Sequence, residues 1–292
     1  MRFIRVSDAE AIYFCMVDEK DRIWSLNNKP NDPRDYLQLY EQAQHLGQSI
    51  SAYAETVAEG GKELPWSLSD LDVPSTSGRP HLMMPYIPPE AWGAAFTYPS
   101  KADNDPYSVA RNAERPVIFF KGTPHRCVGP NEAIGSRADT TKMIPEAELG
   151  LVLLSTGEII GYTVVNDVTS LDLTMESDLY VCYAKIFNRC TSLGPAIVPP
   201  ESIGNPLDLE IRCRVFRNGE LFSDANGNTG NMIRTFDELI HFLMDHNEIP
   251  DGTLLCAGSA ASRERDLHLT EGDLVEIEIA KIGRLANPVI WV

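Results

Sequence analysis

The feature that most constrains the fold is a pair of apolar runs around a short polar break in the middle of the chain. The runs are Leu149–Leu154 and Ile159–Val165, and the sequence Ser-Thr-Gly-Glu at 155–158 separates them. Each run has the length of a strand and is rich in β-branched residues, and the glycine in the break favours a tight turn. This pattern predicts a β-hairpin.

Three carboxylates flank this hairpin. Glu146 and Glu148 are two positions apart, so a strand places both on one face. If the turn is centred on the 156–157 bond, Glu146 lies opposite Asp167, and directly paired residues share a face. Three carboxylates that close repel one another and raise their pKa values, and a hard divalent cation removes this repulsion. All-oxygen ligation suits Mg²⁺ or Mn²⁺, with Ca²⁺ as an alternative, better than zinc.

The competing interpretation of these carboxylates is two exposed strand ends in an acidic chain. The chain carries a net charge of −17 and has a pI of about 4.7. Such a charge repels a phosphate backbone or an anionic membrane, so we expect neither nucleic acid nor membrane as a partner. The apolar runs are shorter than the roughly 18 residues of a membrane span.

Six scattered cysteines without a C-x-x-C pair indicate buried thiols in a reducing compartment. Residues 1–14 do not have the pattern of a signal peptide. We therefore expect a cytoplasmic protein.

The first third of the chain mixes strand and helix patterns. Residues 1–27 alternate enough for two short strands around a turn at 18–21. Residues 36–59 have helical periodicity that Gly47 divides, and the Pro-, Gly- and Ser-rich stretch 60–91 is typical of a linker. These patterns predict a small α/β unit followed by a connecting segment.

Strand patterns dominate the rest of the chain. Strands are predicted at 92–98, 115–121, 253–255, 274–279 and 288–292. A turn is predicted at 193–195, and a hairpin over 207–222 with its turn at 217–219. A capping box at Thr235 and Glu238 predicts one helix, and residues 101–115 read as a loop with a short helix. We expect an α+β, β-rich fold, with a small N-terminal α/β domain and linker over 1–82 and a larger domain over 83–292.

Two lysines stand at positions where their charge has consequences for the proposed metal site. Lys185 lies between apolar neighbours, so its side chain either snorkels to the surface, which is the commoner case, or lies buried beside the acids. In the second case it would donate a hydrogen bond or a proton to an enolate oxygen. Lys121 ends an apolar strand, so it is either a solvated strand end or part of a cationic lip that receives a carboxylate.

The small-residue loop 256–260 also has two interpretations. It is either a tight turn or a group of backbone N–H donors that, with the Ser259 hydroxyl, receives an anion. Serine hydrolase and nucleotide-binding signatures (G-x-S-x-G, G-x-x-x-x-G-K-[ST] and G-x-G-x-x-G) are absent from the sequence.

Taken together, several segments resemble the fumarylacetoacetate hydrolase superfamily. They are RPVIFFK (115–121), PEAEL (145–149), GYTVVNDVTSLDL (161–173), AKIFNRCTSLGP (184–195), NTGNMIRTFDELIHFLM (228–244), PDGTLLCAGSA (250–260) and LTEGDLVEIEIAKIGRLANPV (269–289). The resemblance implies a β-roll core and Mg²⁺ or Mn²⁺ at Glu146, Glu148 and Asp167. It also implies that Lys185 lies near the substrate's 2-keto group, and that the protein is a homodimer or homotetramer.

Within the superfamily, the chain looks most like the 2-keto-3-deoxy-pentonate (arabinonate) dehydratases. The shared features are chain length, the N-terminal domain and FFKGTPHRCVG (119–129), and residues 82–124 lack the histidine expected of a hydrolase. This branch implies a metal-dependent lyase that dehydrates a small anionic 2-keto-3-deoxy sugar acid through a stabilised enolate. The alternatives are a Mg²⁺-dependent C–C hydrolase of acylpyruvate or fumarylpyruvate substrates and an acidic domain that uses the ion for stability alone.

Other site residues follow from this resemblance as candidates. Val117 stands where the dehydratase branch has an acidic residue, so Glu114 becomes the substitute acid–base group beside Lys185. The candidate substrate-binding residues are Lys121, Arg126, Ser259, Gly258 and Tyr98.

Overall fold

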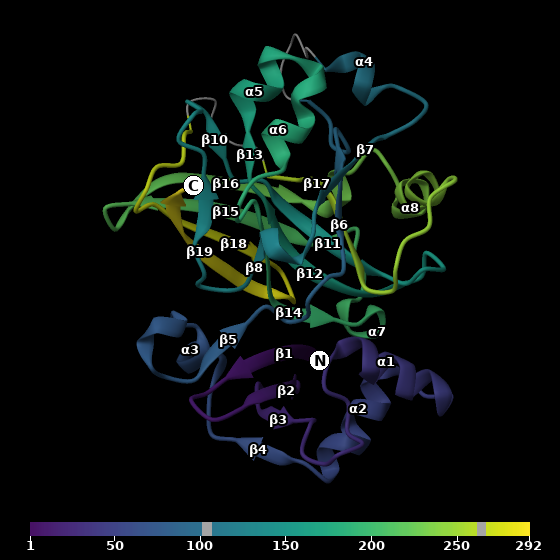
Figure 1. The fold of residues 1–292 in the computed structure, drawn as a ribbon. Helices are drawn as coiled ribbons and strands as arrows, with labels where there is room; N and C mark the ends of the chain where they lie inside the picture. Colours follow the sequence, from purple (N-terminus) through teal and green to yellow (C-terminus); the bar gives the residue numbers. More distant parts are fainter. Residues whose placement is uncertain (101–106, 262–266) are drawn as a thin grey trace.

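A computed structural model describes residues 1–100, 107–261 and 267–292 of the chain. Within these residues the fold is mixed α+β and rich in strands (Figure 1), as the sequence predicts. The strands form a 12-stranded sheet, a five-stranded sheet in the order β16-β15-β18-β19-β9, and the small pair β10-β13.

The N-terminal elements are strands at one edge of the large sheet and three α-helices. They are β1 (Arg2–Ser7), β2 (Ile12–Val17), β3 (Ile23–Ser25), α1 (Tyr36–His45), α2 (Ile50–Glu59), β4 (Lys62–Leu64), α3 (Leu68–Leu71) and β5 (His81–Met83). The predicted division of the helical stretch is confirmed, because Gly47 lies between α1 and α2 with φ of +65°.

Two predictions for this region are wrong. Residues 1–27 form three strands rather than two, because the Asp8 carboxylate accepts the backbone N–H groups of Glu10 and Ala11 and closes an additional turn. The stretch 60–91 is not merely a linker, since β4 pairs with β3 and β5 pairs with β1. Short strands of this kind gain their stability from their neighbours in the sheet, which local composition does not reveal.

The elements of the larger part of the chain follow. The strands are β6 (Ala91–Ala95), β7 (Val117–Gly122), β8 (Cys127–Val128), β9 (Ile134–Ser136), β10 (Met143–Ile144), β11 (Ala147–Leu153), β12 (Ile159–Asp167), β13 (Thr169–Ser170), β14 (Thr191–Val198), β15 (Glu210–Arg217), β16 (Glu220–Asn228), β17 (Thr253–Ser259), β18 (Leu274–Ile279) and β19 (Gly283–Trp291). The helices are α4 (Ser108–Arg111), α5 (Leu171–Glu176), α6 (Val181–Lys185), α7 (Pro200–Ile203) and α8 (Phe236–Met244).

The central hairpin is confirmed as β11 and β12, with the predicted register. Ala147 pairs with Asn166 and Glu148 with Val165, and the Asp167 N–H donates to the Glu146 carbonyl at 3.0 Å. A bulge after Val152 shifts the register only near the turn. Because β17 and β14 pair with the outer sides of the hairpin, it lies in the middle of the sheet, and its apolar run is continuous rather than alternating.

The hairpin also contributes apolar side chains to the main hydrophobic core. Apolar residues of β11 and β12 pack in one cluster with residues of β15, β18 and β19, so the two large sheets face each other across this core. Helix α8 lies against the hairpin: Ile240 and Met244 lie next to Gly157 at the turn, and Phe236 contacts Tyr162 of β12 at a ring-centroid distance of 6.5 Å. The Thr235 hydroxyl accepts the Glu238 N–H as predicted, but the Glu238 carboxylate pairs with Arg234 instead of completing the capping box.

Of the turns and loops predicted at 193–195, 217–219 and 256–260, one is confirmed and two are wrong. The turn at Asn218 and Gly219 is confirmed, with φ of 54° and 81°. The turn expected at 193–195 is wrong, because Gly194 and Pro195 lie inside β14. The residues 256–259 continue β17 instead of forming a loop.

The segment predicted as a loop with a short helix contains α4, and its residues 101–106 lie outside the described part of the chain.

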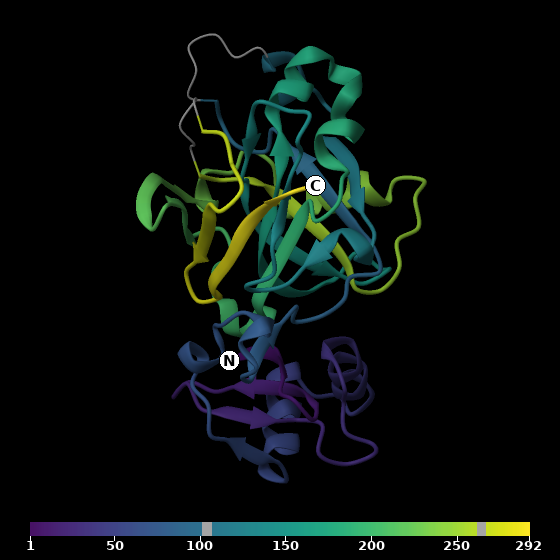
Figure 2. The same ribbon diagram turned by 60° about the vertical axis from the view of Figure 1, so that its left-hand side comes forward.

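The N-terminal elements join the rest of the molecule through β14. Strand β1 pairs with β14, with Phe3 opposite Ile197, so one sheet extends from the N-terminal strands into the hairpin. Figures 1 and 2 show the N-terminal elements at one end of the molecule and helices α5 and α6 at the other. The domain boundary between residues 82 and 83 stays a prediction.

Within the described ranges, none of the helices combines the length and the apolar character that a membrane crossing needs.

We predict that Tyr36→Phe lowers the free energy of unfolding by about 1–2 kcal/mol. The buried Tyr36 hydroxyl donates to the Ile160 carbonyl at 2.6 Å and ties α1 to β12. Tyr40→Phe is the matched control, since its hydroxyl meets Glu158 at 3.1 Å near the surface and its loss costs less than about 0.5 kcal/mol. Urea unfolding followed by circular dichroism measures both, and equal effects would contradict the role of Tyr36.

Candidate metal centre

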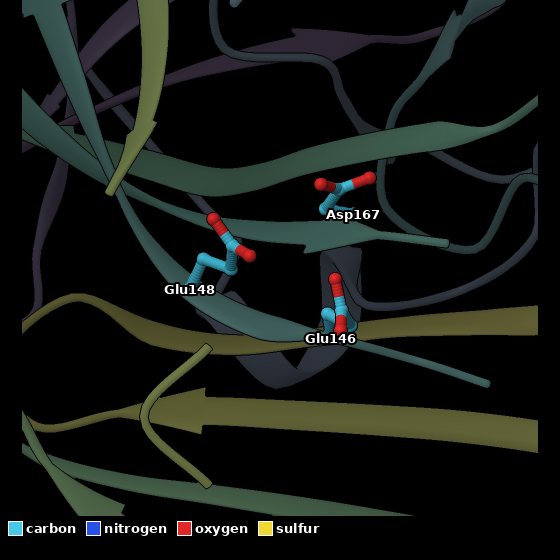
Figure 3. Close-up of side chains that lie close together, drawn as sticks. All are labelled: Glu146, Glu148 and Asp167. Atoms are coloured by element: carbon cyan, nitrogen blue, oxygen red, sulfur yellow. The ribbon is translucent and has the colours of Figure 1, made fainter. Parts of the chain in front are cut away.

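The structure brings three carboxylates together at the open end of the central hairpin. Glu146 precedes β11, Glu148 lies in β11, and Asp167 ends β12. Each offers one oxygen atom, and these atoms all lie within 4.8 Å of one another. Figure 3 shows the three carboxylates pointing toward a common centre from the two strands. The predicted convergence on one face is therefore confirmed.

These carboxylates are removed from water, which makes their mutual repulsion costly. The Glu148 and Asp167 side chains are almost completely buried, and Glu146 is largely so. Burial raises the pKa of Glu148 well above its usual range, and the charges of Asp167 and Glu146 raise it further. A set of converging oxygen ligands with excess negative charge fits a hard divalent cation such as Mg²⁺.

Lys185 supplies one of the positive charges at this cluster. Its Nζ atom lies 2.5 Å from Glu146 Oε2 and 2.7 Å from Asp167 Oδ2, and the side chain is 6% exposed. The preference for a snorkelling lysine is therefore wrong, and the buried alternative holds. Burial alone lowers the pKa of Lys185, but the carboxylates outweigh it and raise that pKa, so the amine stays protonated at neutral pH.

Lys121 supplies a second positive charge from β7. Its Nζ atom lies 2.6 Å from Asp167 Oδ1, and it donates to the carbonyl groups of Val168 at 3.0 Å and Lys185 at 2.5 Å. The side chain is 0% exposed. The interpretation of this lysine as a solvated strand end is therefore wrong, because its side chain is buried and paired with Asp167. Its role in receiving a substrate carboxylate stays a prediction.

Gly258 and Ser259 contact the cluster from β17. The Gly258 N–H donates to Glu148 Oε2 at 2.8 Å, and Ser259 is paired with Glu148 in the sheet. The sequence analysis offered backbone N–H groups at 256–260 as donors to an anion. The Gly258 N–H does bind an anion, which is the Glu148 carboxylate of the protein itself. Gly258 has φ of +97°, and a Cβ atom here would overlap the Thr97 hydroxyl oxygen.

The remaining candidate residues differ in how near they come to the carboxylates. Tyr98 is largely buried, and its pKa is raised by burial and by the charge of Glu148, which places it beside the cluster. Arg126 donates to the Thr123 hydroxyl at 3.0 Å, and the Glu114 residue is exposed. The substrate-binding role of Arg126 and the acid–base role of Glu114 stay predictions.

Two polar residues that the sequence analysis does not single out support Glu146. The Thr169 hydroxyl donates to Glu146 Oε2 at 3.0 Å, and the Asn166 side-chain oxygen accepts the Glu146 N–H at 3.1 Å. Thr169 is two positions beyond Asp167, so the alternation of a strand is a signal that places both on one face. No comparable pattern marks Asn166.

The fold and the carboxylate cluster agree with the sequence comparison. The profile described as "Fumarylacetoacetate (FAA) hydrolase C-terminal" matches residues 92–290. The chain belongs to the fumarylacetoacetate hydrolase family.

Individual relatives place the chain more narrowly. It is 41% identical over 217 residues to "2-dehydro-3-deoxy-D-arabinonate dehydratase" of Saccharolobus solfataricus. This match covers 70% of this chain and 73% of that protein. It is 40% identical over 220 residues to "Probable 2-keto-3-deoxyxylonate dehydratase" of Haloferax volcanii, covering 73% of this chain and 76% of that protein.

A solved structure of "2-keto-3-deoxy-D-arabinonate dehydratase complexed with magnesium and 2,5-dioxopentanoate" matches with a TM-score of 0.84 and 32% identity. The match covers 100% of this chain and 99% of that one. The resemblance to this branch of the family is confirmed.

We predict that Gly258→Ala lowers the free energy of unfolding by roughly 3 kcal/mol or more, because backbone strain and steric overlap with Thr97 add together. Gly272→Ala is the control, since Gly272 has φ of +87° with open space around its Cβ position, and strain alone costs about 1–2 kcal/mol. Chemical unfolding of both variants measures the difference. Equal losses would show that the contact between Gly258 and Thr97 is not tight.

Proposed function

We propose that the chain is a Mg²⁺-dependent lyase that dehydrates a small anionic 2-keto-3-deoxy sugar acid of the pentonate type. The observation that carries this proposal is the buried carboxylate cluster with Lys185, in a chain about two-fifths identical to two dehydratases of such acids. The structural relative whose title names magnesium and 2,5-dioxopentanoate supports both the ion and the substrate class.

Glu146, Glu148 and Asp167 would hold the ion, with Mn²⁺ as an alternative to Mg²⁺. When bound, the ion supplies a Lewis acid that polarises the 2-keto group and makes the neighbouring C3–H bond more acidic. The carboxylates are already gathered before the ion arrives, since the Gly258 N–H orients Glu148 and the Thr169 hydroxyl orients Glu146.

Lys185 is placed to stabilise negative charge on the substrate. A protonated amine has three N–H donors, and Lys185 directs two of them to Glu146 and Asp167. The third is left for the 2-keto oxygen, where negative charge develops as the C3 proton leaves. We therefore propose Lys185 as a hydrogen-bond donor rather than as the base, since in the metal-free site the neighbouring carboxylates raise its pKa.

The reaction itself balances as the loss of one water molecule. A base takes the proton from C3, the C3–C4 double bond forms as the C4–O bond breaks, and a proton is delivered to the leaving hydroxyl, so that one water molecule is lost. The unsaturated product then isomerises to a 2,5-dioxo acid. Glu114 is the proposed acid–base group, at the end of a segment whose carbonyl groups bind Arg234. Tyr98, Arg126 and Ser259 are the proposed substrate contacts.

Three features of the whole protein are proposals that rest on the sequence: the oligomeric state follows from the family resemblance, and the location and the domain division follow from composition and sequence patterns. We propose a homodimer or homotetramer, a cytoplasmic location, and an N-terminal domain over residues 1–82 that is distinct from the catalytic domain over 83–292.

We predict that the purified protein with MgCl₂ converts 2-keto-3-deoxy-D-arabinonate or the D-xylonate-derived acid to 2,5-dioxopentanoate, detected by proton NMR. Activity is lost in EDTA and returns with Mg²⁺ or Mn²⁺. Acylpyruvates serve as the comparison substrates, because a C–C hydrolase would release pyruvate and an acid. Hydrolysis of acylpyruvates without dehydration of the sugar acids would overturn the proposal.

We predict that Glu148→Gln and Asp167→Asn each reduce turnover by more than roughly 100-fold, because outer-shell partners of a metal ligand are already worth about 10–100-fold. Both side chains keep their shape, so circular dichroism shows a retained fold. Glu158→Gln is the matched control, since this residue is exposed near the turn of the same hairpin. Near-normal turnover and Mg²⁺ binding in either variant would contradict the assignment of the ligands.

A further inference from the structure

Five charged side chains form one buried cluster at the candidate metal centre. Three are negative (Glu146, Glu148 and Asp167), and two are positive (Lys121 and Lys185). Lys121 and Lys185 approach different oxygens of Asp167, at 2.6 Å and 2.7 Å, so the Asp167 carboxylate lies between them. With all three carboxylates ionised, the form that ligates a metal ion, the cluster has one net negative charge.

Lys121 is held within the protein and is not placed to contact a ligand. Its Nζ atom donates to the Val168 and Lys185 carbonyl groups and forms an ion pair with Asp167 Oδ1. The side chain is completely buried. Any influence on a bound substrate must therefore act through its charge and through the position of Asp167.

The charge of Lys121 matters because the cluster lies in a medium of low polarity. A divalent ion changes the net charge of the cluster from minus one to plus one, and a 2-keto acid carries one negative charge at neutral pH. The loaded complex is then neutral. Without Lys121 the same complex would hold one uncompensated negative charge away from water, which is unfavourable.

We propose that Lys121 sets the charge of the loaded site and so selects monoanionic 2-keto acids over neutral carbonyl compounds, at the expense of affinity for the metal ion. This inference rests on the proposed function, because it assumes a divalent ion at the three carboxylates. Lys121 is a positioning and specificity residue rather than a catalytic one.

Removing the charge of Lys121 has effects of opposite sign on the metal ion and on the 2-keto acid. The metal-free cluster becomes more negative, so it attracts Mg²⁺ more strongly. The site with Mg²⁺ but without substrate becomes neutral, so it attracts a carboxylate less strongly, while a neutral ligand of the same shape is unaffected. If Lys121 served only to hold the fold together, its removal would weaken the binding of Mg²⁺, of the carboxylate and of the neutral ligand alike.

The test uses the full chain with Lys121→Met, which keeps most of the side-chain volume. Lys121→Gln is the second variant, because its amide retains donors for the two carbonyl groups. Lys281→Met is the matched control, since the Lys281 Nζ atom donates to the Ile203 carbonyl at 2.8 Å away from the cluster. Isothermal titration calorimetry measures the binding of MgCl₂, and then of pyruvate and pyruvamide at saturating Mg²⁺.

We expect both Lys121 variants to bind Mg²⁺ more tightly than the wild type and the Lys281 control. We expect the preference for pyruvate over pyruvamide to fall by roughly tenfold or more. The proposal is overturned if Mg²⁺ affinity falls, if the pyruvate-to-pyruvamide ratio stays the same, or if neither Lys121 variant folds. Failure of the wild type to bind Mg²⁺ would instead refute the proposed function, and the first titration reports this separately.

Discussion

The burial of three like charges beside one another is the constraint on which the rest of the site depends. Glu146, Glu148 and Asp167 would be destabilising on their own, since each carboxylate loses water and meets two others. Two lysines form ion pairs with these carboxylates, and a backbone N–H group and a hydroxyl group donate hydrogen bonds to them, which offsets part of this cost. With all three carboxylates ionised, one negative charge remains, which a divalent cation would more than offset.

Each supporting group reaches the cluster from a different element of the fold. Glu148 lies in β11, Asp167 in β12, and Glu146 directly before β11. β17 contributes the Gly258 N–H, β7 contributes Lys121, and α6 contributes Lys185. β11, β12 and β17 are neighbours in the centre of the large sheet, where packing on both faces restricts their movement. A centre held by rigid strands keeps its ligands in place before metal and substrate bind, and such preorganisation lowers the cost of binding.

The two lysines have different surroundings, and this difference separates their roles. Lys185 is 6% exposed and directs two hydrogen bonds to carboxylates, whereas Lys121 is 0% exposed and donates to two backbone carbonyl groups. The first is therefore suited to direct stabilisation of charge on the substrate, and the second to setting the electrostatic balance around it. The names of the relatives describe dehydratases and tautomerases, so similarity of sequence across these proteins does not by itself fix the reaction.

The sequence by itself determined the features that depend on neighbours along the chain. These include the hairpin, its register, the carboxylate cluster at its open end and the helix break at Gly47, because strand alternation and turn chemistry are local rules.

Only the tertiary structure decided the burial of Lys121 and Lys185, the pairing of β4 and β5, and the use of the Gly258 N–H by Glu148. An apolar segment that ends in lysine has the same local pattern whether its amine meets water or a buried acid. The choice is made by partners dozens of residues away, whose approach is fixed by packing of the whole core rather than by any local preference.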